Sequence, residues 1–279
     1  YNREALRIEP YFSIGSNLVI KILERLVPEN VLVIGRTTLS RSTNNFIKSA
    51  KNLIVIDPRI SEIDSKREGN LLLPTLPAQV KSSKSDVSIW EQASDIAAGE
   101  LASIKWSEQL AIISICESLP DQSALFVGSS RPVRDVEAFC HPRSGIEVFA
   151  NRGLAGIDGT VATATGIALI EREGTTRALI GDLTLLHDAS SLAIDANDGE
   201  LNIQLVVGND GGGTIFAGLE MAAQLEAATF EKLFTTPQQV DLWHLAQAYG
   251  WNYLRVESTS ELESALQTTG RVVIDVRLK

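Results

Sequence analysis

Short runs of β-branched and aliphatic residues alternate along the chain with stretches whose apolar residues recur at helical spacing. This alternation is typical of parallel α/β layers. Apolar runs at 30–36 and 52–58 flank a predicted helix at 39–50, so residues 30–58 should form one βαβ unit. We expect further strands at 123–130, 146–151, 176–182, 203–210, 253–258 and 271–278. Helices are expected at 108–119, 160–173, 184–198, 214–225, 241–250 and 261–267.

The predicted fold class is α/β, with a doubly wound, mostly parallel sheet flanked by helices. Between the βαβ unit and the later strands the chain turns polar, in "SEIDSKREGN" at 61–70 and "KSSKSD" at 81–86. A domain boundary is therefore expected there, which divides the chain into residues 1–85 and 86–279.

Composition narrows the class of protein. The chain has 279 residues, 44% of them hydrophobic and 22% charged, and no apolar run approaches the roughly 18 to 20 residues that span a bilayer. We therefore expect a soluble globular protein. The formal net charge of −10 argues against a nucleic-acid-binding surface. Cys116 and Cys140 lack metal-site spacing, so we interpret them as reduced thiols in a cytoplasmic protein.

Polar residues follow two of the predicted strands at their carboxyl ends. Asp182 comes directly after "RALIG", and Asn209 and Asp210 precede three glycines, 211–213. Parallel strands bring such residues to one edge of the sheet, where open α/β sheets bind ligands. Carboxylate, amide and carbonyl oxygens suit Mg²⁺. Taken alone, Asp182 could instead be a helix N-cap and the glycines a flexible turn.

The spacing of these residues resembles the thiamin-diphosphate fingerprint, in which GDG is followed after a little under thirty residues by NN. Here "GDL" at 181–183 and "ND" at 209–210 match it, with Leu183 in place of the second glycine and Asp210 in place of the second asparagine. Together with "GSSRPVRD" at 128–135, "NRGLAGIDG" at 151–159 and "NDGGGTIF" at 209–216, the chain resembles the 2-succinyl-5-enolpyruvyl-6-hydroxy-3-cyclohexene-1-carboxylate synthases of menaquinone biosynthesis. "GRTTLSR" at 35–41 and "LFTTPQQVDLWHLAQAYG" at 233–250 extend the resemblance over most of the chain.

The resemblance implies an enzyme that uses thiamin diphosphate and Mg²⁺, with Mn²⁺ as an alternative. Such a transferase decarboxylates 2-oxoglutarate and adds the resulting succinic-semialdehyde unit to isochorismate. It also implies that residues 86–279 are a diphosphate-binding domain and that residues 1–85 are part of a Rossmann-like central domain.

The same resemblance assigns roles to individual residues. It makes Asp182, Asn209 and the Gly211 carbonyl the metal ligands. It places Gly181, Leu183, Thr184 and Gly212 beside the cofactor, and Ile157 under it as the residue that keeps it bent. It makes the substrate-binding residues Ser130, Arg134, Arg152, Ile215 and Phe216, although Thr214 shifts the spacing of the last two. Without the resemblance, Ile157 would be interpreted as a core residue, and each loop arginine as a solvated surface charge.

In this family the glutamate that activates thiamin lies in a separate pyrimidine-binding domain contributed by a partner subunit. No residue here matches it, so we expect this chain to be the C-terminal portion of a homodimeric or homotetrameric enzyme and to be inactive alone. Two alternatives stay open: another thiamin-dependent 2-oxoacid decarboxylase or carboligase, and a non-catalytic diphosphate-binding module.

Overall fold

The computed structural model describes residues 23, 27–35, 40–59, 69–78, 88–103, 105–141, 143–151, 154–170, 174–195 and 197–278. The chain forms two compact units, Tyr1–Ser103 and Ile104–Lys279. The boundary predicted between residues 85 and 86 falls within 79–87, outside the described residues. The assignment of the two parts to named domains therefore stays a prediction.

The first unit contains the predicted βαβ arrangement. Strands β1 (Asn30–Ile34) and β2 (Asn52–Ile56) pair in parallel, and helix α2 (Arg41–Ser49) connects them. A third parallel strand, β3 (Leu71–Leu73), and helix α4 (Ser88–Ser103) were not predicted. Three strand residues beside a polar tract are too few to show a period, and the apolar residues of α4 include many small alanines, which mark no clear stripe.

The second unit is built on one parallel sheet of six strands in the order β5-β4-β6-β7-β9-β8. All six were predicted, and their bounds are β4 (Ser123–Val127), β5 (Ile146–Phe149), β6 (Thr176–Gly181), β7 (Ile203–Asn209), β8 (Asn252–Val256) and β9 (Arg271–Arg277). The central strands are buried on both faces, which explains why their sequences are nearly continuous apolar runs.

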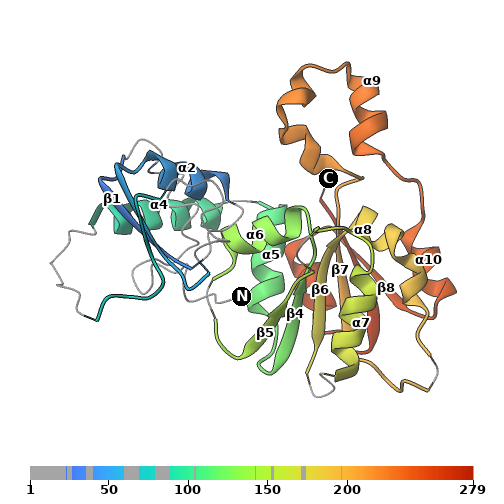
Figure 1. The fold of residues 1–279 in the computed structure, drawn as a ribbon. Coiled ribbons are helices and arrows are strands. Elements are labelled where there is room, and N and C mark those ends of the chain that lie inside the picture. Colours follow the sequence, from blue (N-terminus) through green and yellow to red (C-terminus); the bar gives the residue numbers. More distant parts are fainter. Residues whose placement is uncertain are drawn as a thin grey trace. The chain divides into compact units, whose positions relative to one another are not determined.

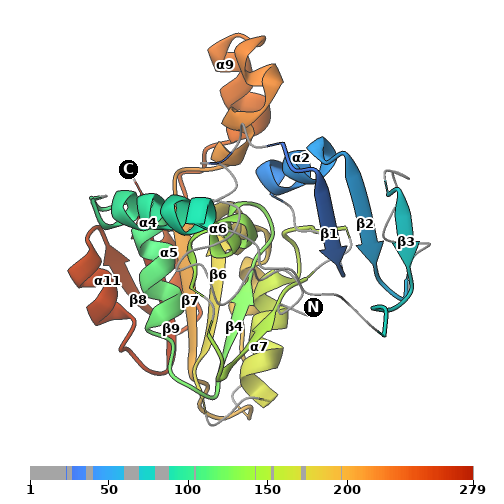
Figure 2. The ribbon, with the colours of Figure 1, turned by 90° about the vertical axis from the view of Figure 1, so that its left-hand side faces the viewer.

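Helices cover both faces of this sheet (Figures 1 and 2). Apolar residues of α5 (Glu108–Glu117), α6 (Arg131–Phe139) and α11 (Thr259–Ala265) pack on one face. Those of α7 (Thr160–Ile170), α8 (Asp182–His187) and α10 (Leu242–Ala248) pack on the other. The predicted doubly wound α/β class is thus confirmed. In the part of the chain that the structure describes, no helix combines the length and apolar character needed to cross a membrane.

Two predicted helices differ from the structure. The helix expected at 184–198 begins at Asp182, ends at His187 and is followed by the 3₁₀ turn η2 (Ala189–Leu192). Asp188 interrupts it, because its carboxylate accepts hydrogen bonds from the Ala162 N–H and the Ser191 hydroxyl.

The helix expected at 214–225 is wrong. Its place is taken by two 3₁₀ turns, η3 (Thr214–Gly218) and η4 (Glu220–Ala223), which are followed by α9 (Ala227–Phe230) and a π-helical turn, η5 (Glu231–Thr235). None of the residues in these elements is buried, so no packing against the sheet supports a regular helix. They form the orange arm beyond the carboxyl ends of the strands (Figure 1).

A buried arginine joins the sheet to two helices. Arg177 on β6 has no exposed surface, and its guanidinium donates to the side chain of Gln204, to the carbonyls of Ile115 and Leu266 and to the Ser118 hydroxyl. Burial, and secondarily the charge of Arg143, lowers the pKa of Arg177 to about 10, so it is still a cation at neutral pH. Its acceptors other than Gln204 lie at the carboxyl ends of α5 and α11, where helix dipoles favour positive charge.

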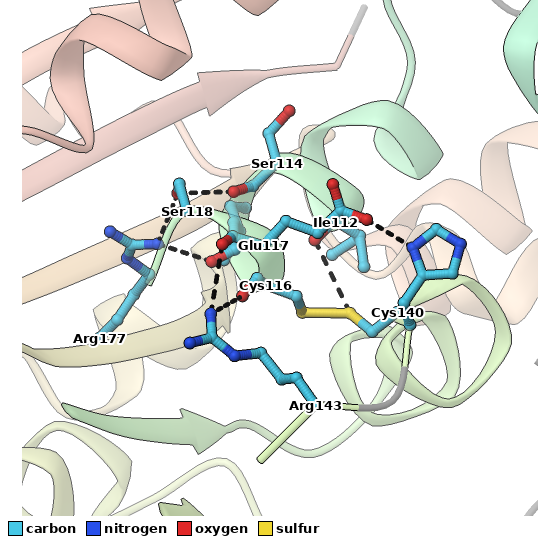
Figure 3. Close-up of a disulfide and its surroundings, with 10 residues drawn as sticks. Ile112, Ser114, Cys116, Glu117, Ser118, Cys140, Arg143 and Arg177 are labelled. Atoms are coloured by element: carbon cyan, nitrogen blue, oxygen red, sulfur yellow. Dashed lines mark hydrogen bonds and ion pairs between the residues drawn. A yellow bond between two sulfur atoms is a disulfide. The ribbon is translucent and has the colours of Figure 1, made fainter. Parts of the chain in front are cut away.

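The expectation of two reduced thiols is wrong in this structure. Cys116 and Cys140 form a disulfide that joins the end of α5 to the C-cap of α6, with their Cα atoms 6.1 Å apart (Figure 3). A sequence separation of 24 residues does not indicate this pairing. It arises because the two helices pack side by side on the same face of the sheet.

Candidate functional site

The order of the strands locates a candidate ligand site. The chain leaves β4 toward β5 and leaves β6 toward β7, and these two neighbours lie on opposite sides of the β4–β6 pair. The connections therefore diverge between the carboxyl ends of β4 and β6, which is where open α/β sheets bind ligands. Ser130 follows β4 and Asp182 follows β6, so both lie at this switch point.

Asp182 is buried at the end of β6, with 8% of its surface exposed. It is not the N-cap of α8; Gly181 holds that position, and the Asp182 carboxylate accepts the N–H of Leu183 at 2.7 Å. Burial raises the pKa of Asp182, and the negative charge of Asp210 raises it further, while the backbone N–H groups of Leu183 and Gly212 oppose the rise. Asp182 thus lies within electrostatic reach of the loop after β7.

The side chain of Asn209, the last residue of β7, is held by a hydrogen bond that its amide nitrogen donates. Its Nδ2 donates to the Oδ1 atom of Asp275 at 2.9 Å, and both residues are buried. A carboxylate accepts hydrogen bonds but has none to donate, so the amide nitrogen must face Asp275. The amide oxygen of Asn209 therefore points to the other side.

The glycines after Asn209 form a packed loop rather than a free turn. Gly211 and Gly212 have positive φ angles of 86° and 124°. A Cβ atom on Gly212 would lie 2.2 Å from the Thr235 carbonyl oxygen, and the Gly213 N–H donates to that same oxygen at 2.7 Å. The loop can follow this path only with glycine, because a side chain at residue 212 would collide with the backbone of residue 235.

An ion pair links the start of α6 to this loop. Arg131 Nη1 lies 3.4 Å from Asp210 Oδ2 and 3.3 Å from the Thr214 hydroxyl, which also donates to Asp210. No role was predicted for Arg131 from the sequence. The available signal was Asp210, which adds a negative charge where the fingerprint has asparagine and so favours a nearby cation. The ends of β4 and β7 are tied together by this contact.

The predicted substrate-binding residues that the structure describes are divided between half-buried and exposed positions. Ser130 adopts φ 74° and ψ −130°, an uncommon conformation for a residue other than glycine, and its carbonyl accepts a bond from Arg134 at 2.5 Å. Arg134 is exposed, and Arg152 lies outside the described residues. Ile215 is half-buried, and the exposed ring of Phe216 lies 5.8 Å from that of Phe234.

The predicted cofactor-side residues lie near the ends of β6 and β5. Gly181 and Leu183 flank Asp182, and Thr184 is buried one residue further along α8. Ile157 is half-buried in the loop before α7, where its carbonyl accepts the Thr160 hydroxyl at 3.1 Å. Ile157 belongs to neither core cluster of the second unit, so its side chain is not explained by core packing.

The donor set fits a hard dication. Within the described residues, no group of three or more His, Cys, Asp or Glu side chains could hold a metal. The predicted set differs from such a cluster, because it consists of one carboxylate, one amide oxygen and one carbonyl. Asp182 and Asp210 repel each other, and a cation between the strand ends would relieve that repulsion.

Comparison with known proteins identifies the family to which this chain belongs. Residues 133–276, just over half of the chain, match the model of the thiamine pyrophosphate enzymes' C-terminal TPP binding domain. Relatives named 2-succinyl-5-enolpyruvyl-6-hydroxy-3-cyclohexene-1-carboxylate synthase include one from Clavibacter michiganensis, 44% identical over 62% of this chain and 31% of its own length.

Two relatives of the same name match more of the chain. The protein of Paenarthrobacter aurescens is 36% identical over 90% of this chain and 47% of its own length, and that of Renibacterium salmoninarum is 36% identical over 93% and 49%. The chain thus spans between about a third and a half of the length of these curated relatives. It belongs to the family of thiamine pyrophosphate enzymes that share this C-terminal cofactor-binding domain.

Proposed function

We propose that this protein is the diphosphate-binding part of a 2-succinyl-5-enolpyruvyl-6-hydroxy-3-cyclohexene-1-carboxylate synthase. The observation that carries the proposal is the meeting of Asp182 with the 209–213 loop at the carboxyl edge of the sheet, inside the region that matches the TPP binding domain. The names of the relatives supply the reaction. Residues 1–85 would then be part of the central domain and residues 86–279 the diphosphate-binding domain.

Asp182, the amide oxygen of Asn209 and the carbonyl of Gly211 would hold Mg²⁺, or Mn²⁺ in its place. These three oxygens would hold the dication, which would supply positive charge beside the diphosphate, since Mg²⁺ is usually bound by one or two carboxylates together with phosphate oxygens. Gly181, Leu183, Thr184 and Gly212 would line the diphosphate, and Ile157 would support the bent cofactor. When bound, thiamin diphosphate supplies the electron sink for decarboxylation of a 2-oxoacid.

The substrates would be 2-oxoglutarate and isochorismate, both dicarboxylic acids. In a chain with net charge −10, their carboxylates need defined cations rather than a general positive field. Arg134 and Arg152 would supply these cations and Ser130 a hydroxyl, with Ile215 and Phe216 on the apolar side. Arg131 is not assigned to a substrate carboxylate, because its guanidinium already forms an ion pair with Asp210.

The activating glutamate would come from a pyrimidine-binding domain of a second subunit, in a homodimer or homotetramer. A cytoplasmic location is also part of the proposal, and it can be tested by cell fractionation.

The experiment mixes the protein with the half of the Renibacterium relative that this chain does not match, and it follows carbon dioxide released from 2-oxoglutarate. We expect release only with both polypeptides, thiamin diphosphate, Mg²⁺ and isochorismate. Equal release from pyruvate would favour another thiamin-dependent decarboxylase, and cofactor binding without turnover a non-catalytic module. Turnover by the chain alone would contradict a site shared between subunits.

A further inference from the structure

A carboxylate is buried in the interior of the second sheet beside the candidate metal site. Asp275 lies on β9, between β7 and β8, and none of its surface is exposed. An ionised carboxylate in such a place destabilises the folded state unless other groups compensate its charge. The sequence pattern does not indicate its role, because Asp275 merely interrupts an otherwise apolar strand.

Three side chains converge on this carboxylate. Tyr253 donates its hydroxyl to Oδ2 at 2.6 Å, and Arg277 lies 2.8 Å from the same oxygen. Oδ1 accepts the amide of Asn209 at 2.9 Å. Arg277 and Tyr253 already compensate one oxygen with a cation and a hydroxyl. Among the contacts that the structure describes, the other oxygen, Oδ1, has one partner, Asn209.

That partner is the residue whose amide oxygen the proposed function uses. An asparagine amide can turn over at little cost, since its oxygen and nitrogen ends have the same shape. With nitrogen toward the metal, the residue would present two N–H donors and repel a cation. The Asp275 carboxylate prevents this because it accepts only from the nitrogen end.

We propose that Asp275 is a positioning residue that fixes the amide of Asn209 with its oxygen toward the metal. The proposal rests on the proposed function, since it takes Asn209 to be a metal ligand. It assigns to Asp275 the part that outer hydrogen-bond partners play at metal sites, where their loss typically weakens metal affinity by roughly 10- to 100-fold.

The test measures Mn²⁺ binding by electron paramagnetic resonance at saturating thiamin diphosphate. Asp275→Asn keeps the shape of the side chain but presents either amide end, so Asn209 loses its fixed orientation. We expect Mn²⁺ affinity to fall by roughly tenfold or more. Tyr253→Phe is the matched control, because it removes a donor to the other oxygen of Asp275 and leaves the Asn209 bond. Its Mn²⁺ affinity should equal that of the wild type.

A second variant separates orientation from folding. Asp275→Asn leaves Arg277 without its buried partner, and that alone can destabilise the protein. Asp275→Asn combined with Arg277→Gln removes both charges, and it should show the same loss of Mn²⁺ affinity. In metal-free protein, the side-chain ¹H–¹⁵N resonances of Asn209, assigned with Asn209→Ala, should move in both Asp275 variants and stay in place in Tyr253→Phe.

The outcomes distinguish this proposal from the one on which it rests. Wild-type Mn²⁺ affinity in the Asp275 variants, with the wild type binding normally, would overturn the positioning role and leave the metal site standing. Equal losses in Tyr253→Phe and Asp275→Asn would also overturn it, because both would then act through stability. If the wild type itself takes up no Mn²⁺ with thiamin diphosphate, the metal site is wrong and the positioning role falls with it.

Discussion

At the scale of single residues, Gly212 is a position that cannot accept a side chain without a change in the backbone around it. Its φ is 124°, and a Cβ atom added to it would lie only 2.2 Å from the Thr235 oxygen, so both features exclude a side chain. We predict that Gly212→Ala lowers the free energy of unfolding by about 2 kcal/mol, as measured by urea denaturation. Gly166→Ala is the control, because Gly166 lies within α7 with open space around it and should gain about 0.5 to 1 kcal/mol. Equal stability of the two variants would contradict the packed loop.

Tyr253 provides a residue-scale prediction on pH. Burial, the hydrogen bond to Asp275 and the negative charge of Asp275 raise the pKa of Tyr253 from 10.0 to about 12. The folded state therefore holds the phenol proton more tightly than the unfolded state. This stabilisation is fully present below pH 10 and is lost as the pH rises through about 12.

The ultraviolet absorbance of tyrosinate tests that shift. The difference between the titrations of the wild type and Tyr253→Phe should show one tyrosine ionising near pH 12. In Asp275→Asn that step should move to lower pH, since the charge that opposes ionisation is gone. A Tyr253 that ionises near pH 10 in the wild type would contradict the hydrogen bond to Asp275.

At the scale of elements, the disulfide joins α5 to α6, and α6 begins at Arg131, directly after Ser130. Closing a loop of this length stabilises a fold by about 3 kcal/mol in the chain-entropy account. We predict that Cys116→Ser with Cys140→Ser lowers the free energy of unfolding by about that amount. Oxidised wild-type protein should yield no thiols to a thiol reagent after unfolding. Two reactive thiols in the oxidised protein would show that the pair does not form.

The elements also show how much of the fold could be predicted from the sequence. The central strands of the second sheet were predictable because burial on both faces leaves an apolar run that can be recognised without knowing its partner. The arm at 214–235 was not, because its apolar residues recur at helical spacing although no surface covers them. Helix α6 was missed because "RPVRD" carries charges and a proline at its start.

The residues of the candidate site likewise include some that the sequence could predict and some that it could not. That Asp182, Asn209 and the glycines lie together could be predicted, because they lie at or just after strand ends and strand ends share one edge of a sheet. Arg131 and Asp275 were missed, since their partners lie 79 and 66 residues away in the sequence. A single arginine after a strand resembles a solvated charge until the fold brings Asp210 beside it. The pairing of Cys116 with Cys140 could not be predicted either, because only the fold brings these two residues together.

At the scale of the whole molecule, the candidate site lies at one edge of the six-stranded sheet. The carboxyl ends of β4, β6 and β7 meet there, and the ion pair between Arg131 and Asp210 joins the first to the last. The proposed function requires this edge of the sheet to bind the diphosphate of the cofactor together with a divalent metal.

The most direct test is a calorimetric titration of thiamin diphosphate into the protein, with Mg²⁺ and with the metal removed by a chelator. We predict binding that needs Mg²⁺ and that weakens roughly tenfold or more in Asp182→Ala, a loss of about 1.4 kcal/mol or more. Glu200→Ala, which removes an exposed carboxylate from the same unit, should bind as the wild type does. Binding that is independent of Mg²⁺ and unchanged by Asp182→Ala would contradict the proposed cofactor site.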